Sequence, residues 1–367
     1  MNLRPPGYEP GELPDCSTPQ CLGASCAQER ILRGSSVSGK ENLVKHNSFI
    51  FKPLNPYHRK RIAAERRRRH VYNGARPFTP TPGVDMLLAI DMGNTQTAMG
   101  LFDGDELVQS WRMPTDRSYT ADEIHVRLMG FFKMYDLSLG AVDAIAFAGV
   151  VPQLSREWHA VANRIAADAI VIGPQTAAVT KLRAARPQAV GADRIANAVA
   201  AETFYGAPAI VVDFGTATNI DVIDEDGYYI GGAIAPGIRI SMDALAARAA
   251  KLASVPLEAP EHAIGRDTEE CIKVGAVMGA ASMAEGLVAR MKRELGREDA
   301  TVIATGGLAG IVADSTDAFD VVDGQLTIKG ICEIYRRMQK LGVKQGHKSS
   351  TPNATAPQTF AKPIPQN

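Results

Sequence analysis

Two loops of similar composition lie about 120 residues apart in the chain. Each follows a short apolar run and combines an aspartate with glycine and threonine: Asp91-Met92-Gly93-Asn94-Thr95 and Asp213-Phe214-Gly215-Thr216-Ala217-Thr218. A carboxylate at a strand end can hold a metal ion directly or through water. Glycine lets backbone N–H groups approach phosphate oxygens, and threonine or asparagine side chains donate further hydrogen bonds. The pair therefore predicts a phosphate-binding site with one loop from each half of a duplicated fold.

Two further blocks accompany these loops. Gly191-Ala192-Asp193-Arg194 lies between them, and Thr305-Gly306-Gly307-Leu308-Ala309 follows them. A carboxylate such as Asp193 at the start of a predicted helix can stabilise the helix N terminus, or it can accept a proton from a substrate. Arg194 offers a planar fork that fits a carboxylate. Asp-x-Gly also occurs in ordinary turns, so phosphate binding is inferred from the two matching copies and not from one loop.

The elements that position these blocks follow from hydrophobic periodicity. The first half predicts strands at residues 87–90, 97–102, 106–112, 143–148 and 169–172 and a helix at 121–135. After Gly191 the second half predicts helices at 193–205, 241–252 and 268–295 and strands at 209–212, 219–223, 228–233 and 301–304. This order is an internal repeat of an α/β unit. Small residues such as Gly275 and Gly279 would let another helix approach the last helix, from the same subunit or from a second one.

Composition places the chain among soluble globular proteins. It has 367 residues, 45% of them apolar and 22% charged, which leaves room for two domains. We expect no membrane segment, because no run of 18 or more apolar residues is evident. We expect no secretory signal, because residues 1–20 lack its charged start and apolar run. The five cysteines, an odd number, favour reduced thiols, and the spacing of Cys16, Cys21 and Cys26 does not fit a structural zinc site. A cytoplasmic location is therefore predicted.

The two ends of the chain differ from the globular part. Residues 1–85 contain 14 Lys and Arg against 7 Asp and Glu, whereas the remainder contains 26 against 33. We predict a disordered basic extension over 1–85 and a disordered tail over 342–367. A nucleic-acid-binding arm at Arg66–Arg69 is the alternative, but no aromatic side chains interleave the arginines. Met86 is a plausible translation start, in which case the extension is not translated.

With the blocks in this order, residues 86–340 resemble the type III pantothenate kinases, bacterial enzymes of the acetate and sugar kinase/chaperone/actin superfamily. The matching blocks include the two loops and Gly191-Ala192-Asp193-Arg194, together with Val150-Val151-Pro152, Gly231-Gly232-x-Ile234-x-Pro236-Gly237, Ile264-Gly265-Arg266-Asp267-Thr268 and Thr305-Gly306-Gly307-Leu308-Ala309. The resemblance implies an α/β fold of duplicated ribonuclease-H-like (actin-like ATPase) domains with a cleft between them. We expect the domains at residues 86–190 and 191–341.

The resemblance also implies the reaction and the residues that perform it. The γ-phosphate of ATP would pass to the primary hydroxyl of pantothenate, the first step of coenzyme A biosynthesis, in a homodimer that needs Mg²⁺ and a monovalent cation, K⁺ or NH₄⁺. Asp193 would be the catalytic base, Asp213 would coordinate the monovalent cation, and Thr216 would contact ATP. The first phosphate loop would comprise Asp91, which holds Mg²⁺ indirectly, with Met92, Gly93, Asn94, Thr95, Gln96, Thr97 and Ala98. The substrate site would comprise Gly191, Ala192, Asp193, Arg194 and Thr268.

Two assignments in this set have local alternatives. Thr268 would be a helix cap on sequence grounds alone, whereas the resemblance implies that it contacts pantothenate from the partner subunit. Thr305–Ala309 is either a plain strand-to-helix turn or, by resemblance, a contact to adenosine. The segment 175–185 departs from the family, since Ala184 stands where many members have Tyr or Asp.

Two other functions are compatible with the sequence. The same fold could act on another acceptor, as a kinase or a phosphatase of the same superfamily. A non-enzymatic accessory factor in gene regulation is the other alternative, and the presence of Asp91, Asp193 and Asp213 argues against it.

Overall fold

The computed structural model describes residues 85–149, 152–166, 168–173, 176, 179–248 and 255–342. The predicted basic extension up to residue 84, the predicted tail from residue 343 and the Val150-Val151 pair lie outside the described residues, as does part of the divergent 175–185 segment.

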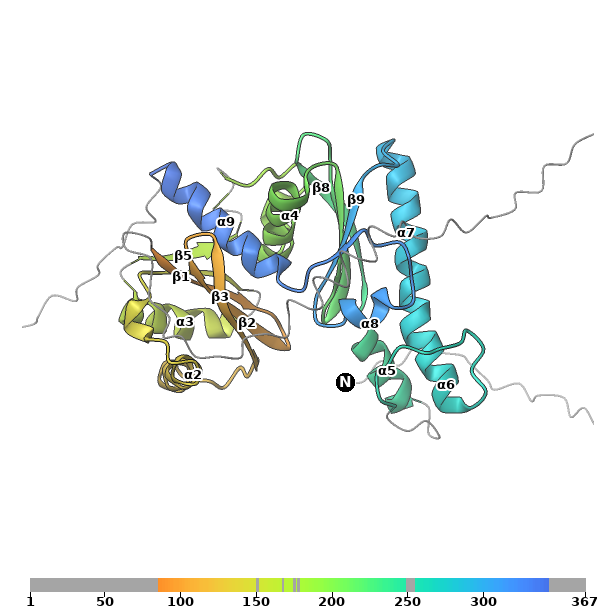
Figure 1. The fold of residues 1–367 in the computed structure, drawn as a ribbon, viewed down its shortest axis with the longest axis horizontal. Coiled ribbons are helices and arrows are strands. Elements are labelled where there is room, and N and C mark those ends of the chain that lie inside the picture. The colour runs from red at the N-terminus through yellow and green to blue at the C-terminus, as the bar shows by residue number, and fades with distance from the viewer. Residues whose placement is uncertain are drawn as a thin grey trace, which may run out of the picture. The chain divides into compact units, whose positions relative to one another are not determined.

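The first five-stranded sheet holds the first acidic loop (Figure 1). Its strands are β1 (Met86–Met92), β2 (Gln96–Asp103), β3 (Glu106–Pro114), β4 (Ala144–Gly149) and β5 (Asp168–Ile172). Strands β1 to β3 form an antiparallel meander, and β4 and β5 continue the sheet parallel to β1, in the order β3-β2-β1-β4-β5. Helices α2 (Ala121–Lys133) and α3 (Pro152–Ile165) contribute to the hydrophobic cluster on one face of the sheet.

Helix α2 shows how local sequence sets an element boundary. Thr120 caps its N terminus by accepting from the backbone N–H of Glu123, and the Glu123 carboxylate accepts from Thr120 N at 2.9 Å. This reciprocal capping box satisfies two backbone donors that would otherwise lack partners. Ile124, Leu128 and Phe132 recur at helical spacing and are buried against the sheet.

The second sheet repeats the first. It contains β6 (Ala209–Phe214), β7 (Ala217–Ile223), β8 (Tyr229–Pro236), β9 (Thr301–Thr305) and β10 (Val321–Val322), in the order β10-β9-β6-β7-β8. Strands β6 to β8 again form an antiparallel meander, while β9 and β10 run parallel to β6. The predicted internal repeat is therefore confirmed, and the strand order of both sheets is that of a ribonuclease-H-like α/β fold.

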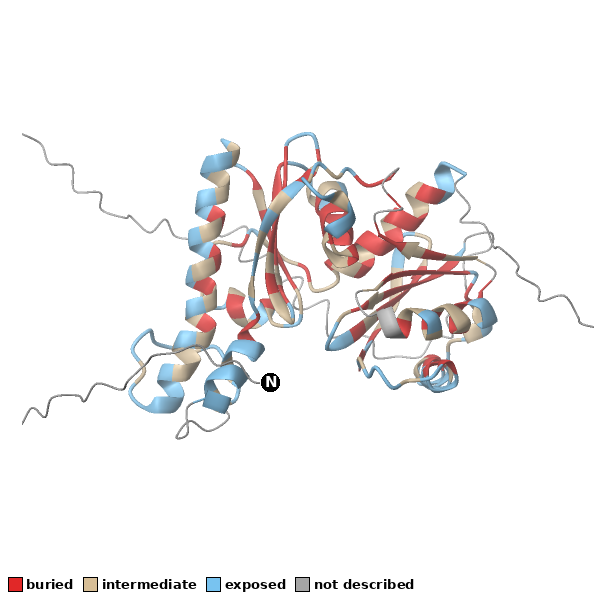
Figure 2. Cartoon of the chain, turned by 180° about the vertical axis from the view of Figure 1, so that it is seen from behind, coloured by how far each residue is buried: buried red, intermediate tan, exposed pale blue. Residues whose placement is uncertain are grey.

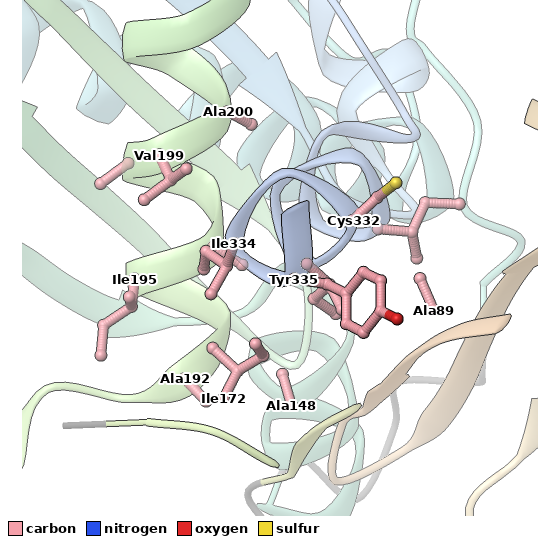
Figure 3. Packing of buried hydrophobic residues seen from close by; sticks show 14 of the residues in the cluster. Ala89, Ala148, Ile172, Ala192, Ile195, Val199, Ala200, Cys332, Ile334 and Tyr335 are labelled. Carbon is pink, nitrogen blue, oxygen red and sulfur yellow. The ribbon is translucent and has the colours of Figure 1, made fainter. Parts of the chain in front are cut away.

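Two helices lie between the sheets and share one core with both. They are α4 (Ala192–Tyr205) and α9 (Leu326–Lys340), and Figure 3 shows their side chains meeting those of β1 and β4. The two helices approach so closely that a Cβ on Gly330 of α9 would lie 1.9 Å from the backbone oxygen of Ala196 in α4, so only glycine fits at that position. Helix α9 was not predicted from the sequence.

The outer face of the second sheet packs against α5 (Ile238–Arg248), α7 (Gly279–Leu295) and α8 (Ala309–Ala313). Helix α6 (Thr268–Lys273) and a π-helical turn at Val274–Met278 run directly into α7. The resulting helix, Thr268–Leu295, corresponds to the predicted 268–295 helix. Helix α5 begins three residues before the predicted start at residue 241, because Ile238 already packs on the sheet.

From the sequence we expected no stretch that is apolar enough to cross a membrane, and the Thr268–Leu295 helix differs from that expectation. Its 28 residues include an 18-residue window with a mean hydropathy of 1.4, so by length and composition it could cross a membrane. The apolar character of this window was overlooked because glycine and alanine, and not long apolar side chains, make up much of it. A single such helix is weak evidence for a membrane span. Ala281, Ala284 and Val288 pack on the second sheet, and Figure 2 shows buried residues at intervals along the helix with exposed ones between them.

Candidate active site

The first acidic loop joins β1 to β2. Asp91 is the penultimate residue of β1, and the following turn closes with a hydrogen bond from Gly93 N to Gln96 O at 3.1 Å. A Cβ on Gly93 would lie 2.9 Å from that same oxygen, so the tight turn favours glycine. Asn94, Thr95 and Gln96 are exposed at the tip. The exposed side chains at this tip can face an anionic ligand.

Three of the eight residues predicted for this loop have side chains in the protein interior. Met92 belongs to the core beneath α2 and α3, and Ala98 packs against the core between the sheets. Thr97 is buried, and its Oγ1 lies 2.9 Å from Thr115 Oγ1. These three residues can offer a ligand only backbone groups. The side chains of Asp91, Asn94, Thr95 and Gln96 are therefore the ones available at the site.

The second acidic loop meets the first. It joins β6 to β7 and is closed by a hydrogen bond from Gly215 N to Ala217 O at 3.0 Å. Thr216 Oγ1 lies 2.9 Å from Thr95 Oγ1, although the two residues are 121 positions apart in the sequence. The two predicted phosphate loops are thus brought into direct contact.

Asp213 is held from two sides. Asn197 Nδ2 in α4 donates to Asp213 Oδ2 at 3.0 Å, and Asn197 Oδ1 accepts from Thr327 Oγ1 in α9 at 2.8 Å. On the other side, Gly306 has a φ of +90° and a Cβ there would lie 2.4 Å from Asp213 Oδ1. Glycine is required both by the left-handed backbone and by this close approach. The Thr305–Ala309 block therefore lies directly against the second loop.

Asp193 stands in the first turn of α4, but it does not cap the helix. The N-cap is Gly191, and no side chain caps this terminus. Among the described residues, the Asp193 carboxylate has no hydrogen-bond partner. A Cβ on Gly191 would lie 2.4 Å from Asp193 Oδ1, so the glycine leaves room for that carboxylate. The capping alternative considered from the sequence thus lacks its hydrogen bond, and the carboxylate is available as a proton acceptor.

The three carboxylates act on one another electrostatically. Burial, followed by the charges of Asp193 and Asp213, raises the pKa of Asp91 to about 8. Burial and then the charge of Asp193 raise the pKa of Asp213 to about 6. Such mutual effects require the groups to lie close together. The convergence of Asp91, Asp193 and Asp213 on one site is supported by these effects and stays a prediction.

This acidic site suits cations, although it is not a ready-made metal centre. Within the described ranges, no group of three or more His, Cys, Asp or Glu side chains has the arrangement of a metal site. Magnesium in kinases is commonly held by one or two carboxylates together with water and substrate phosphates. Asp91 and Asp213 fit that kind of partial coordination, because both are oxygen ligands whose ionised forms gain from a nearby positive charge.

Arg194 is held by a fully buried carboxylate. Its Nε donates to Asp221 Oδ1 at 2.7 Å, and its Nη2 lies 2.6 Å from the same oxygen. Asp221 Oδ2 has no hydrogen-bond partner among the described residues. Burial raises the pKa of Asp221 to about 7, even though Arg194 lowers it. The sequence predicted that the Arg194 guanidinium binds a substrate carboxylate. Asp221 occupies the Nε and Nη2 atoms of that group, and Nη1 takes no part in the ion pair.

Comparison with known proteins decides the family. A model of the family described as type III pantothenate kinase matches residues 87–290. The chain is 48% identical over 257 residues to the type III pantothenate kinase of Thermomicrobium roseum, covering 70% of this chain and 98% of the relative. The chain belongs to the type III pantothenate kinase family.

Two further relatives match a similar share of this pantothenate kinase. The type III pantothenate kinases of Streptomyces griseus and Moorella thermoacetica are each 45% identical to the chain. Each match includes 69% of the chain, with 98% of the Streptomyces griseus enzyme and 99% of the Moorella thermoacetica enzyme. The solved structure of (R)-2-hydroxyglutaryl-CoA dehydratase component A from Acidaminococcus fermentans covers 70% of this chain and 99% of its own, at 15% identity and a TM-score of 0.43. The fold assignment rests on the strand order and not on that structure.

The capping alternative for Thr268 of the kinase is wrong. Asp267, and not Thr268, is the N-cap of α6, since the Asp267 side chain accepts from Glu270 N at 2.8 Å. Aspartate caps a helix better than threonine, so the preceding residue takes the role. Thr268 is exposed in the first turn and forms no hydrogen bond with the other predicted site residues in the described part of the kinase.

Two residues at the kinase site were missed from the sequence. Asp221 is an acid in the apolar strand β7, and a buried carboxylate needs a partner, so its position was a usable signal. Arg112 lies on β3, and its charge lowers the pKa of both Asp91 and Asp213. No local pattern marked Arg112, because the residues it acts on are distant in the sequence.

The raised carboxyl pKa values predict how the stability of the kinase depends on pH. Carboxyl groups of an unfolded chain titrate near pH 4, whereas burial and neighbouring carboxylates raise the pKa of Asp91 to about 8. The folded state therefore holds an extra proton between these values, so this contribution to stability falls as the pH rises from about 4 to about 8 and levels off above 8. We expect the Tm of the protein without added Mg²⁺ to fall between pH 7 and 8 and to level off by pH 9, with a smaller fall for Asp91→Asn.

Calorimetry across this pH range checks the expectation. The range lies above the one in which His159 titrates, since burial lowers the pKa of that imidazole from its usual 6.5. Equal pH slopes for the unsubstituted protein and Asp91→Asn would contradict the assignment to Asp91.

Proposed function

We propose that the chain transfers the γ-phosphate of ATP to the primary hydroxyl of pantothenate, giving 4′-phosphopantothenate in the first step of coenzyme A biosynthesis. The observation that carries the proposal is its membership of the type III pantothenate kinase family over nearly the whole globular region. The contact between the two acidic loops at Thr95 and Thr216 supports it, because a phosphoryl donor needs groups on both sides.

Phosphoryl transfer needs neutralised phosphate charge, an aligned hydroxyl and a group that takes the hydroxyl proton. Asp193 takes that proton, because its carboxylate has no hydrogen-bond partner among the described residues and lies close to Asp91 and Asp213. The backbone amides of the two loops and the hydroxyls of Thr95 and Thr216 donate to phosphate oxygens. The transferred phosphoryl group thus lies between the loops, with the acceptor hydroxyl on the Asp193 side.

Cations complete the charge balance at this site. Asp91 would hold Mg²⁺ through water and Asp213 would hold a monovalent cation, K⁺ or NH₄⁺. Bound Mg²⁺ would neutralise charge on the phosphates of ATP. Without cations, these buried carboxylates would repel a triphosphate whenever they are ionised.

Arg194 gives the site its preference for an acceptor that carries a carboxylate. Asp221 fixes the orientation of the guanidinium through Nε and Nη2, so Nη1 is held in one position from which it can donate to the substrate. Tyr229 adds to this restraint, because its ring centroid lies 5.5 Å from Arg194 Cζ. Ala184 packs against the core between the sheets and cannot supply the polar contact that Tyr or Asp would make there.

An ATP-dependent assay of the full chain tests this function. Pantothenate is compared with other hydroxy acids and with sugars, with and without K⁺. Preferential phosphorylation of pantothenate is the expected result. A higher kcat/KM with another acceptor would favour the alternative superfamily kinase, and no turnover with any acceptor would favour the non-enzymatic accessory role.

We also propose a homodimer, in which Thr268 of one subunit reaches the pantothenate of the other. Exposed small residues recur along one side of the Thr268–Leu295 helix: Cys271, Gly275, Gly279, Ser282 and Gly286. A Cβ added at Gly275, Gly279 or Gly286 would meet nothing within 4 Å. Small residues at this spacing let two helices approach closely. The exposed Ile234, Ile240 and Ile264 of the same half provide apolar surface for such a contact.

Substitution of Gly279 separates the dimer contact from the subunit fold. Gly279→Leu fits the isolated subunit and favours the helix, since leucine has a higher helix propensity than glycine. In the dimer the new side chain would hold the two helices apart. We expect a dimeric mass by light scattering for the unsubstituted protein and a monomeric mass for Gly279→Leu. Gly130→Leu, in α2 and equally open, is the matched control and should stay dimeric.

The remaining predictions stay proposals. We place the kinase in the cytoplasm, with the domains dividing at residues 190 and 191, and expect no membrane or nucleic-acid partner.

A further inference from the structure

Arg112 connects the first sheet to the second half of the chain. It is exposed on β3, and its Nη2 donates to the backbone oxygen of Gly324 at 3.1 Å, in the connection between β10 and α9. Nearby, Gln325 Nε2 donates to Ser110 Oγ at 3.1 Å. A Cβ added at Gly307 would lie 3.4 Å from Arg112 Nη1. The guanidinium therefore lies against the glycine-rich Thr305–Ala309 block, which itself contacts Asp213.

The charge of Arg112 acts on both acidic loops. It lowers the pKa of Asp91 and of Asp213 against the larger raising effect of burial. Arg112 nevertheless forms no ion pair with a carboxylate among the described residues. A guanidinium has five N–H donors, and the bond to Gly324 uses one of them. Four donors and a full positive charge are thus left beside two loops whose backbone suits phosphate.

We propose that Arg112 binds phosphate oxygens of the nucleotide, with its guanidinium fork between the two acidic loops and the Gly306-Gly307 turn. This inference rests on the proposed function, in which ATP is the phosphoryl donor. Arginine suits this position because its planar fork pairs with two phosphate oxygens at once. The single bond to Gly324 fixes the direction of the side chain and leaves the other edge of the fork free. Arg112 would bind the nucleotide only, and the proton transfer stays with Asp193.

The alternative is that Arg112 only ties β3 to the Gly324 segment. Arg112→Gln distinguishes the two roles, because its amide can still donate to the Gly324 oxygen but carries no charge. Arg112→Lys keeps the charge and loses the fork, and Arg112→Ala loses both. Arg117→Ala is the control, since Arg117 is also exposed, three residues after β3 ends, and is not among the charges that shift the pKa of Asp91 or Asp213.

The test is calorimetric titration of the full chain and each variant with ATP, ADP and adenosine, all in Mg²⁺. We expect Arg112→Ala and Arg112→Gln to bind ATP and ADP about 10- to 100-fold more weakly, the size of a lost charged hydrogen bond, and adenosine normally. Arg112→Lys should lie between these variants and the unsubstituted protein. Arg117→Ala should bind all three ligands normally.

Three outcomes would overturn the inference. Unchanged ATP and ADP affinity in Arg112→Gln would show that the charge does not meet phosphate. An equal loss for adenosine would show that the arginine only supports the fold. If the unsubstituted protein binds no ATP, the proposed function fails together with this inference. Binding of ATP without phosphorylation of pantothenate would instead contradict the proposed function alone. Thermal unfolding of each variant confirms that it is folded, and Arg112→Lys carries the test if the others are not.

Discussion

Asp193→Asn is expected to lower kcat for pantothenate phosphorylation at least about 100-fold, the lower range for loss of a general base, while ATP still binds. The amide keeps the shape of the side chain but cannot take the hydroxyl proton. Because the carboxylate makes no capping bond on α4, the helix should lose little stability. Steady-state kinetics and calorimetric titration with ATP check the two halves of this expectation.

Asp122→Asn is the matched control for this substitution. Asp122 also lies in the first turn of a helix, α2, where it is exposed and pairs with Arg164 at 2.6 Å. An exposed pair of this kind contributes at most about 1 kcal/mol. If Asp193 only stabilised its helix through the dipole, both variants would lose about 0.3–1 kcal/mol of stability and keep their turnover. Near-normal turnover in Asp193→Asn would therefore refute its role as the base.

Arg194→Met is expected to cost about 3–5 kcal/mol of stability, the usual effect of leaving a buried charge without its partner. Asp221 is fully buried, and its one bonded oxygen depends on Arg194. The variant should also raise KM for pantothenate far more than KM for ATP, because the guanidinium is expected to face the substrate carboxylate. Urea unfolding and steady-state kinetics measure the two effects.

The double variant Arg194→Met/Asp221→Leu separates these two effects. Replacing both members of a buried ion pair by apolar side chains is often neutral for stability. We expect the double variant to recover most of the lost stability and to keep the high KM for pantothenate. Recovery of KM along with stability would mean that Arg194 acts only through the fold.

Much of the architecture could be predicted because it is encoded in short stretches of sequence. The alternation of strands and helices predicts the first sheet and four of the five strands of the second, all but β10, and the two Asp-x-Gly loops predict where phosphate would bind. The contact between Thr95 and Thr216 follows from the duplication, since equivalent loops lie at equivalent strand ends.

The remaining features depend on contacts that local patterns do not describe. Arg112 and Gly324 are 212 positions apart, so no motif joins them. Helix α9 is an exception, because Ile331, Ile334 and Met338 recur at helical spacing and this local pattern was overlooked. Whether Asp193 is a cap or a base could not be decided locally, because both roles favour a carboxylate in the same first turn. The capping alternative for Thr268 was wrong because the better capping side chain of Asp267 comes directly before it.

The position of α9 has a consequence for how the protein is made. Leu87 and Ala89 of β1 share a core with Ile331 and Ile334 of α9, which is synthesised some 240 residues later. While the chain leaves the ribosome, the part of the first sheet that packs against α9 stays uncovered until α9 has been synthesised. Exposed apolar sheet of this kind invites aggregation and chaperone binding. Truncation before residue 326 should therefore yield insoluble protein, and folding of the first half has to wait for the last helix.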